Sequence, residues 1–149
     1  MLTVSTSLAR GDGEDLSGPR LVELCRAAGL EVLHETVGDD RAAIAAALAR
    51  LADEEGTRFV FTTGGTGLTR DDVTPEATLD VIDREAPGYA ETIRADSRRH
   101  TPLGILTRGV SGVRGRTLIV NLPGNPKAID QSWPLLEPTL EHAAATLER

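Results

Sequence analysis

The sequence is poor in cysteine and in aromatic residues. Its only cysteine, Cys25, excludes an internal disulfide and a cysteine-based zinc site, and it is in keeping with a reducing compartment. Aromatic residues make up 3% of the 149 residues, so the core must be built mainly from Leu, Val, Ile and Ala. We expect Cys25 to be a small core residue, and the few large core members are Phe59, Phe61, Tyr89 and Trp133.

Long apolar runs and an excess of positive charge are absent as well. No segment approaches the roughly 20 apolar residues that cross a bilayer, and Met1 to Val4 has neither the basic start nor the apolar stretch of a signal peptide. The expected location is the cytoplasm, without membrane contact. A formal net charge of -7 argues against nucleic-acid binding, because affinity for a polyanion rests on patches of Lys and Arg. A small phosphorylated ligand is compatible with this charge if backbone N–H groups, local arginines or a metal receive it.

The order of apolar runs and turn residues predicts an α/β fold in a single domain, residues 1–149. Strands are expected at 2–4, 30–37, 59–63 and 117–122. Helices are expected from Ser17 to Gly29, from Asp39 or Asp40 to Gly56, from Thr74 through Ile82 to a break at Pro87, from Tyr89 to Arg99, and from Asn125 onward. The expected N-caps are Ser17, Thr74 and Asn125. The alternation of strand and helix predicts a mostly parallel central sheet with helices on both faces.

A glycine-rich turn follows the third expected strand. It consists of Thr63, Gly64, Gly65, Thr66 and Gly67, and it stands at the carboxyl end of the sheet, where open α/β folds bind ligands. Three glycines let the backbone approach a phosphate closely and point N–H groups at it, and two threonine hydroxyls add donors. The turn matches neither the P-loop nor the Gly-x-Gly-x-x-Gly pattern. Taken alone, it is explained equally well as a tight connection that needs glycine for its dihedral angles.

Acidic pairs follow two of the expected strands. Asp71 and Asp72 come soon after the glycine turn, and Asp39 and Asp40 follow the second strand, so both pairs are expected at the same edge of the sheet. Carboxylates beside a phosphate site suggest a bridging divalent metal such as Mg²⁺. The alternatives are a solvated loop or a helix cap for the first pair, and for Asp39 a cap of the helix that begins near Arg41.

Further candidates lie in the second half of the chain. The turn from Pro123 to Lys127 follows the last strand and frames a ligand with its backbone or simply begins a helix. Arg108, Arg114 and Arg116, interspersed with glycines, form either a site for an anionic substrate or an exposed hairpin. The three histidines, His34, His100 and His142, show no metal-ligand spacing and receive no role.

Three motifs stand in order along the chain. They read Thr62-Thr63-Gly64-Gly65-Thr66-Gly67, Arg70-Asp71-Asp72-Val73-Thr74-Pro75-Glu76-Ala77 and Asn121-Leu122-Pro123-Gly124-Asn125-Pro126. Together with the stretches 14–19 and 112–115, they resemble the signatures of the molybdopterin adenylyltransferase family, which includes the Mog and MoaB proteins and the gephyrin G domain. The resemblance covers nearly the whole chain.

This resemblance implies a three-layer α/β/α sandwich, usually a homotrimer. It also implies a role in molybdenum cofactor biosynthesis, namely the transfer of AMP from Mg-ATP to the terminal phosphate of molybdopterin with release of pyrophosphate. Mg²⁺ is then the cofactor, ATP and molybdopterin are the substrates, and a molybdate-insertion enzyme is an expected partner.

The resemblance also assigns residues. Asp39 and Asp72 fall on the family's two essential aspartates, which hold Mg²⁺ against the triphosphate. The nucleotide-binding positions are Thr63, Gly64, Gly65, Thr66, Gly67, Pro123, Gly124 and Asn125. The molybdopterin-binding positions are Ser17, Gly18, Thr107, where the family commonly has serine, and Arg108.

Three positions depart from the family pattern. Thr6 stands where many members carry aspartate, Gly38 where proline often precedes the first essential aspartate, and Asp71 where a non-acidic residue is common. Two alternative functions are a non-catalytic molybdopterin-binding or scaffold protein of the same fold and a nucleotide hydrolase of the competence-damage type. Because Asp39 and Asp72 are both retained, catalysis is favoured over binding alone.

Overall fold

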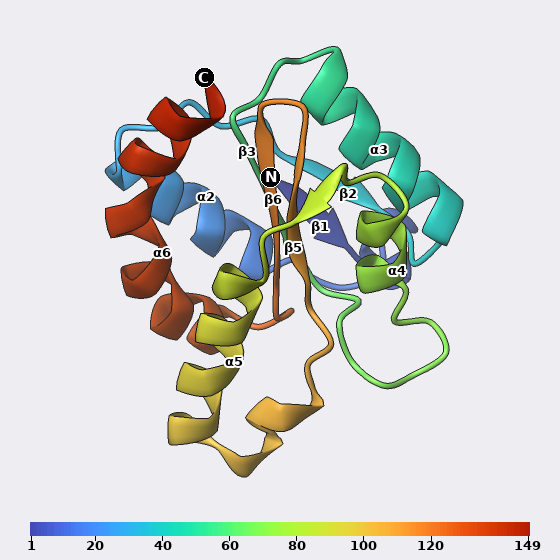
Figure 1. The fold of residues 1–149 in the computed structure, drawn as a ribbon. Coiled ribbons are helices and arrows are strands. Elements are labelled where there is room, and N and C mark those ends of the chain that lie inside the picture. Colours follow the sequence, from blue (N-terminus) through green and yellow to red (C-terminus); the bar gives the residue numbers. More distant parts are fainter.

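A computed structural model describes all 149 residues, and its centre is a six-stranded sheet (Figure 1). The strands are β1 (Leu2–Val4), β2 (Glu35–Val37), β3 (Phe59–Thr63), β4 (Arg84–Glu85), β5 (Ser111–Arg114) and β6 (Thr117–Leu122). They stand in the order β2-β1-β3-β6-β5-β4. The four strands from β2 to β6 in this order run parallel, whereas β5 pairs antiparallel with β6 and β4 antiparallel with β5. The prediction of a mostly parallel sheet is confirmed.

Helices cover both faces of this sheet. They are α1 (Thr6–Ala9), α2 (Ser17–Ala27), α3 (Arg41–Asp53), α4 (Thr74–Leu79), α5 (Pro87–His100), the 3-10 helix η1 (Pro102–Leu106) and α6 (Pro126–Leu147). Figure 1 shows α2, α5 and α6 on one side and α3 and α4 on the other. The predicted three-layer α/β/α architecture is therefore confirmed. No helix has both the length and the apolar character that a membrane span requires.

Alternation along the central strands builds two separate cores. In β3, Val60 packs with α3 and α4, whereas its neighbour Phe61 packs with α2, α5 and α6. Ile119 and Val120 of β6 divide in the same way, and all four side chains are almost fully buried. Complete burial of one such side chain stabilises the fold by about 1.5–3 kcal/mol. These buried strands fix the positions of the loops that leave their carboxyl ends.

The second strand is shorter than predicted. The sequence suggests a strand over 30–37, but only Glu35–Val37 pairs in the sheet. The reason lies in its neighbour: β1 has three residues, Leu2 to Val4, which match Glu35 to Val37 one for one. The apolar residues between Leu30 and His34 lie outside the ladder. Strand length here is limited by the partner strand, which local sequence does not reveal.

The predicted helix from Thr74 ends early, and Pro87 has the opposite role to the one expected. Helix α4 stops at Leu79, because the following backbone turns to pair with β5: Asp83 N–H donates to the Val113 carbonyl and Ala86 N–H to the Ser111 carbonyl. Pro87 is the first residue of α5 and not a helix breaker.

One of the three predicted N-caps is confirmed. Asn125 caps α6 by accepting the Ala128 N–H at 2.8 Å. Ser17 is instead the first residue inside α2, where the Asp15 carboxylate accepts the Gly18 N–H at 2.8 Å. Thr74 likewise lies inside α4, and its hydroxyl donates to the Gly64 carbonyl at 3.0 Å.

Candidate active site

The loops after the parallel strands gather at one edge of the sheet, toward the lower part of Figure 1. The backbones of these loops approach one another closely because glycine has no Cβ. Gly64 has a φ of +99°, and a Cβ at this position would fall 2.3 Å from the Val4 carbonyl oxygen of β1. A Cβ on Gly124 would lie 3.0 Å from the Gly64 Cα. The glycine turn, the end of β1 and the loop after β6 are therefore in direct backbone contact.

The threonine hydroxyls of the glycine turn are already engaged. Thr63 donates its hydroxyl proton to the Pro123 carbonyl at 2.8 Å, which joins the two loops. Thr66 is buried, and its hydroxyl accepts from the hydroxyl of Thr107 at 3.4 Å. The Thr63 hydroxyl proton is thus used to shape the site, although the sequence suggests it as a ligand donor.

Backbone amides at this edge, in contrast, are free. The N–H groups of Gly65, Thr66 and Gly124 donate no hydrogen bond within the protein. The amino-terminal end of the 22-residue helix α6 begins directly after the Pro123 loop. Free amides and a helix amino terminus both attract anions, so this edge is suited to phosphate groups.

Asp39 stands beside this cluster and is not the helix cap. Asp40 caps α3 by accepting the Ala43 N–H at 2.7 Å. Asp39 instead forms a reciprocal pair with Thr6 at the end of β1. Its Oδ2 accepts the Thr6 N–H at 2.7 Å, and its own N–H donates to the Thr6 hydroxyl at 2.9 Å. The capping alternative for Asp39 is therefore wrong, and Thr6 fixes the carboxylate at the ligand edge.

Asp72 lies at the end of the loop that continues from the glycine turn, and this loop, residues 64–72, is called the glycine loop. Its Oδ2 accepts the backbone N–H of Thr69 at 2.9 Å and the Thr69 hydroxyl at 2.6 Å. Partial burial acts to raise the pKa of Asp72, but the hydrogen bonds from Thr69 and from the Gly67 backbone, together with the charge of Arg108, outweigh it and hold the pKa below its usual value. The carboxylate is therefore ionised at neutral pH, as a metal ligand must be. The neighbouring Asp71 is exposed.

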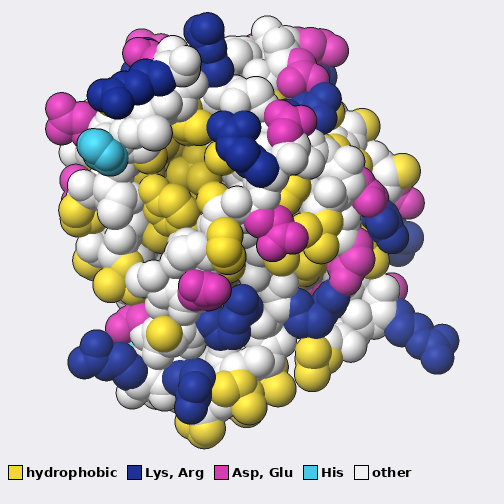
Figure 2. Space-filling view, in the orientation of Figure 1, with side chains coloured by type: hydrophobic (Ala, Val, Ile, Leu, Met, Phe, Trp, Pro, Cys, Tyr) yellow, Lys and Arg dark blue, Asp and Glu magenta, His cyan; other side chains and the backbone are white.

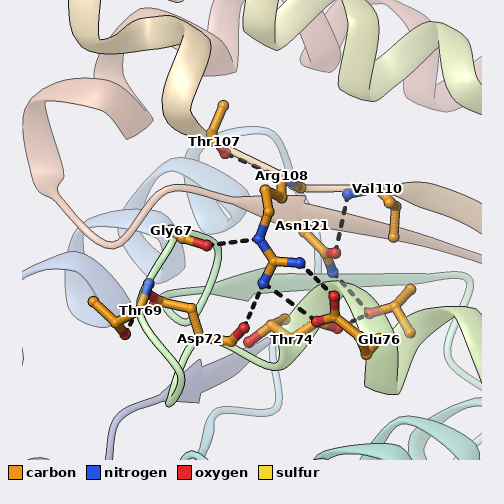
Figure 3. A network of polar contacts seen from close by, with 11 residues as sticks. Gly67, Thr69, Asp72, Thr74, Glu76, Thr107, Arg108, Val110 and Asn121 are labelled. Carbon is orange, nitrogen blue, oxygen red and sulfur yellow. Dashed lines mark hydrogen bonds and ion pairs between the residues drawn. The ribbon is translucent and has the colours of Figure 1, made fainter.

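Arg108 bridges both ends of the same loop, as Figure 3 shows. Its Nε donates to the Gly67 carbonyl at 2.7 Å and its Nη2 to the Asp72 carbonyl at 2.5 Å. Glu76, in the first turn of α4, forms an ion pair with the same guanidinium. The Arg108 N–H also donates to the Thr66 carbonyl at 2.8 Å.

The other arginines of the basic stretch lie elsewhere. Arg114 pairs with Asp53 at the end of α3 and donates to the Val81 carbonyl at 2.7 Å. It belongs to the hairpin between β5 and β6, whose tip includes the exposed Arg116 and points away from the ligand edge. The hairpin interpretation is correct for these two residues, and only Arg108 reaches the glycine loop.

Ser17 and Gly18 lie at the beginning of α2, against β1. A Cβ on Gly18 would come within 3 Å of the side chains of Asp15, Thr3 and His34. The Thr3 hydroxyl donates to Asp15 at 2.8 Å and lies 2.9 Å from His34 Nε2. Gly18 is thus required by the packing of three polar side chains. His34, to which the sequence assigns no role, is part of this cluster.

The donor set at this edge suits Mg²⁺. No group of three or more His, Cys, Asp or Glu side chains is arranged to hold a metal. Such a group is not needed, because Mg²⁺ is commonly bound by one or two carboxylates together with substrate phosphates and water. Asp39 has a carboxylate oxygen, Oδ1, without a protein partner, and Asp72 is held ionised. Both residues therefore fit a nucleotide-bound magnesium ion.

Cavity size alone would place the site elsewhere. Two cavities of about 590 and 620 Å³ lie beside Leu30 and Phe59 and contain none of the expected ligand residues. A smaller one of about 280 Å³ is lined by Thr107, Pro123 and Asn125, with His100 and Lys127 at its side. We assign the site to this edge because free amides and carboxylates meet there.

Several contributing residues have no clear signal of their own in the sequence. Glu76 and Thr6 act through contacts with partners 32 and 33 positions away. Asn121 lies buried under the glycine turn. Its amide donates to the hydroxyls of Thr62 and Thr78, and its Oδ1 accepts the Val110 N–H. Glu76 and Asn121 do occur within the three ordered motifs, which is the one signal that points to them.

The ion pair of Arg108 and Glu76 makes stability depend on pH. Hydrogen bonding to Arg108 lowers the pKa of Glu76 from its ordinary 4.5. A carboxylate with a lowered folded-state pKa stabilises the fold above its unfolded pKa, and this stability is lost as the pH falls through the folded value. We expect Glu76→Gln to lower the free energy of unfolding at pH 7 by about 1 kcal/mol or less, since the pair is about a third exposed.

Urea denaturation measured between pH 7 and about pH 3 checks this expectation. The difference between the unmodified protein and Glu76→Gln should shrink as the pH falls. A difference that stays constant over this range would show that the charge of Glu76 does not contribute.

The chain is similar to known proteins over almost its whole length. The family described as "Probable molybdopterin binding domain" matches residues 1–142. A protein named molybdopterin adenylyltransferase from Helicobacter pylori (strain ATCC 700392 / 26695) is 37% identical over 145 residues, which cover 95% of this chain and 82% of the relative. A protein of the same name from Escherichia coli (strain K12) is 40% identical over 135 residues, which cover 89% of this chain and 69% of the relative.

Solved structures agree with these sequence relatives. The crystal structure of the molybdopterin biosynthesis enzyme MoaB from Thermus thermophilus superposes with a TM-score of 0.91 at 44% identity. The superposition covers 98% of this chain and 92% of that one. The site described above thus lies wholly within the part of the chain that matches these proteins.

Proposed function

The chain belongs to the molybdopterin-binding domain family of the molybdopterin adenylyltransferases, and on this premise we propose that it transfers AMP from ATP to the terminal phosphate of molybdopterin. Its role is in molybdenum cofactor biosynthesis. The observation that carries the proposal is the meeting of free backbone amides with the carboxylates of Asp39 and Asp72 at one edge of the sheet. Amides receive phosphate, and carboxylates receive the metal that accompanies it.

In the proposed reaction, an oxygen of the molybdopterin phosphate attacks the α-phosphorus of ATP. A new P–O bond forms, the bond between the α-phosphorus and the bridging oxygen breaks, and pyrophosphate leaves with the electron pair. The residues do no covalent work. The amides of Gly65, Thr66 and Gly124 and the amino terminus of α6 align the two mutually repelling anions. Asp39 and Asp72 would hold Mg²⁺, which neutralises charge on the leaving pyrophosphate when bound.

The molybdopterin side of the site is assigned to the cavity of about 280 Å³. Thr107 lines it together with Pro123 and Asn125, so a group bound there lies next to the nucleotide loops. Lys127 and His100 at its rim are suited to an anionic substrate. Ser17 and Gly18 remain proposed contacts from the amino-terminal end of α2.

The competing functions differ in what happens to ATP. A scaffold protein would bind molybdopterin and leave ATP unchanged, and a hydrolase would release phosphate or pyrophosphate from ATP alone. The adenylyltransferase should release pyrophosphate only when ATP, Mg²⁺ and molybdopterin are all present. We would measure pyrophosphate with each component left out in turn. Release without molybdopterin would favour the hydrolase, and no release in the complete mixture would reject catalysis.

Thr6 provides a test of the Asp39 position. Thr6→Val keeps the shape of the side chain but removes the acceptor for the Asp39 N–H, so Asp39 loses one of the two hydrogen bonds that join it to residue 6. We expect turnover to fall about tenfold, in line with the loss of one part-buried hydrogen bond. Thr6→Ser retains the hydroxyl and should keep most of the activity. Equal activity of the valine and serine variants in the pyrophosphate assay would remove Thr6 from the positioning of Asp39.

We also propose that the enzyme acts as a homotrimer in the cytoplasm and passes its product to a molybdate-insertion enzyme. One observation supports self-association. Leu103, Ile105 and Leu106 of η1 are between 42% and 67% exposed, and hydrophobic atoms gather at the lower tip of the molecule in Figure 2, where Figure 1 places η1. Light scattering of the purified protein measures the number of subunits.

A further inference from the structure

The family resemblance predicts that Arg108 contacts molybdopterin, but its side chain is already occupied. Three of its nitrogens donate hydrogen bonds to protein acceptors: Nε to the Gly67 carbonyl, Nη2 to the Asp72 carbonyl, and Nη1 to Glu76. About a third of its side chain is exposed, so the three bonds act together and each one alone contributes little. A guanidinium has five N–H donors in a rigid plane, and here that plane spans the loop (Figure 3).

The two carbonyls mark the ends of one loop segment. Residues 68–71 between them are exposed. Within the segment, Asp72 N–H donates to the Thr69 carbonyl, and the Asp72 carboxylate accepts from Thr69. Arg108 is the one side chain that joins Gly67 to Asp72 from outside the segment. Without it, the position of the carboxylate would depend on the local turn alone.

Arg108 is itself held from two directions. Glu76 of α4 fixes its guanidinium, and Arg94 of α5 donates to the carbonyls of Thr107 and Gly109, which flank Arg108 in the chain. The loop is therefore anchored through Arg108 to two helices on opposite faces of the sheet. An arrangement of this kind is rigid, and a rigid support is what a metal-binding carboxylate needs.

We propose that Arg108 is a positioning residue, which together with Glu76 ties Gly67 to Asp72 and so holds the Asp72 carboxylate in place for the magnesium-bound nucleotide. This inference rests on the proposed function for its consequence in catalysis. The tie itself is a property of the free protein, so it is tested separately.

Hydrogen exchange of the ligand-free protein tests the tie directly. Arg108→Met should speed exchange of the hydrogen-bonded amides of this segment, those of Thr69 and Asp72, by about tenfold or more, because the segment then opens without unfolding the domain. Glu76→Gln is a milder variant and should shift the same amides in the same direction. Unchanged exchange of residues 65–73 in both variants would overturn the proposal.

Arg114 supplies the matched control. Its guanidinium also pairs with a carboxylate, Asp53, and donates to a backbone carbonyl, that of Val81, but it does so at the opposite edge of the sheet. Arg114→Met should alter exchange near the β5–β6 hairpin and leave residues 65–73 unchanged. A general loss of stability would instead affect both regions in both variants.

The consequence for the metal is measured with Mn²⁺ in place of Mg²⁺. Electron paramagnetic resonance of Mn²⁺ in the presence of ATP gives its affinity, which we expect Arg108→Met to weaken by about tenfold and Glu76→Gln to weaken by less. Turnover should fall with it, by about 100-fold for Arg108→Met, the size of effect that a small misplacement of a reacting group produces. The KM for molybdopterin should stay the same.

Direct contact of Arg108 with substrate predicts the opposite sign for Glu76→Gln. In that case Glu76 competes with the substrate phosphate for the guanidinium, and removal of its charge should raise activity or lower the KM for molybdopterin. Either result would overturn the proposal. If the unmodified protein bound no metal-nucleotide and formed no product, the proposed function would fail, and hydrogen exchange would still decide whether Arg108 ties the loop.

Discussion

Asp72→Asn should reduce the transfer of AMP by about 1000-fold, the upper range for the loss of one electrostatic contact in an active site. Asparagine has the same shape, and its Oδ1 still accepts the hydrogen bonds from Thr69 that close the loop. The fold should therefore remain intact. What is lost is the negative charge, and with it the attraction for Mg²⁺. Steady-state kinetics at several Mg²⁺ concentrations, together with thermal unfolding, measure both effects.

The neighbouring residue is the natural control for this prediction. Asp71→Asn removes the same charge one position earlier in the chain, but Asp71 is exposed and forms none of the bonds that position Asp72. Its turnover should stay within about twofold of the unmodified protein, as expected for a screened surface charge. An active Asp72→Asn variant, or equal losses in the two variants, would remove Asp72 from the metal site.

Gly64→Ala should lower stability by about 3 kcal/mol, which corresponds to a fall in melting temperature of roughly 10 °C for a domain of this size. Two penalties combine at this position. Its φ of +99° is unfavourable for alanine, and the new Cβ would lie 2.3 Å from the Val4 carbonyl oxygen, which belongs to the central sheet and cannot move aside. Any protein that does fold should bind ATP weakly, because the turn must shift.

The substitution Gly56→Ala distinguishes the backbone penalty of a positive φ from the steric penalty of the added Cβ. Gly56 also has a positive φ, +60°, but no atom lies within 4 Å of the position that a Cβ would occupy. Gly56→Ala should therefore show only the backbone penalty, about 1 kcal/mol. Differential scanning calorimetry of both variants gives the comparison. Similar losses in the two would mean that contact between the glycine turn and β1 does not restrict this position.

Local sequence correctly predicts those helices and strands whose extent does not depend on pairing with distant segments. The buried strands β3 and β6 and the helices α2 and α6 follow from apolar patterns and turn residues, with Asn125 as the cap of α6. The expected strand 30–37 is too long, because its length is set by the three residues of β1. The reversed role of Pro87 has a similar origin, in pairing with β5. Both errors concern contacts between distant segments.

In the site, too, local patterns are predicted correctly, whereas contacts between distant residues are not. The glycine turn and the acidic pairs can be placed at one edge because carboxyl ends of parallel strands share an edge. The pattern does not reveal that Asp40 is the cap and that Asp39 is held at the ligand edge, since this depends on Thr6, 33 positions away from Asp39. Nor does it reveal that Arg108 faces the loop, because that contact spans 41 positions. Side-chain partners of this kind require the folded structure.

The central claim is that ATP donates its AMP group to molybdopterin at this site. ATP labelled at the α-phosphorus tests it most directly, in a mixture with Mg²⁺, molybdopterin and the purified protein. We expect the label to appear in molybdopterin as an adenylyl group, in equal amount to the pyrophosphate released, and Asp72→Asn to form almost none. Label that remains in ATP, or that is released as free AMP, under conditions where a known molybdopterin adenylyltransferase is active would contradict the account.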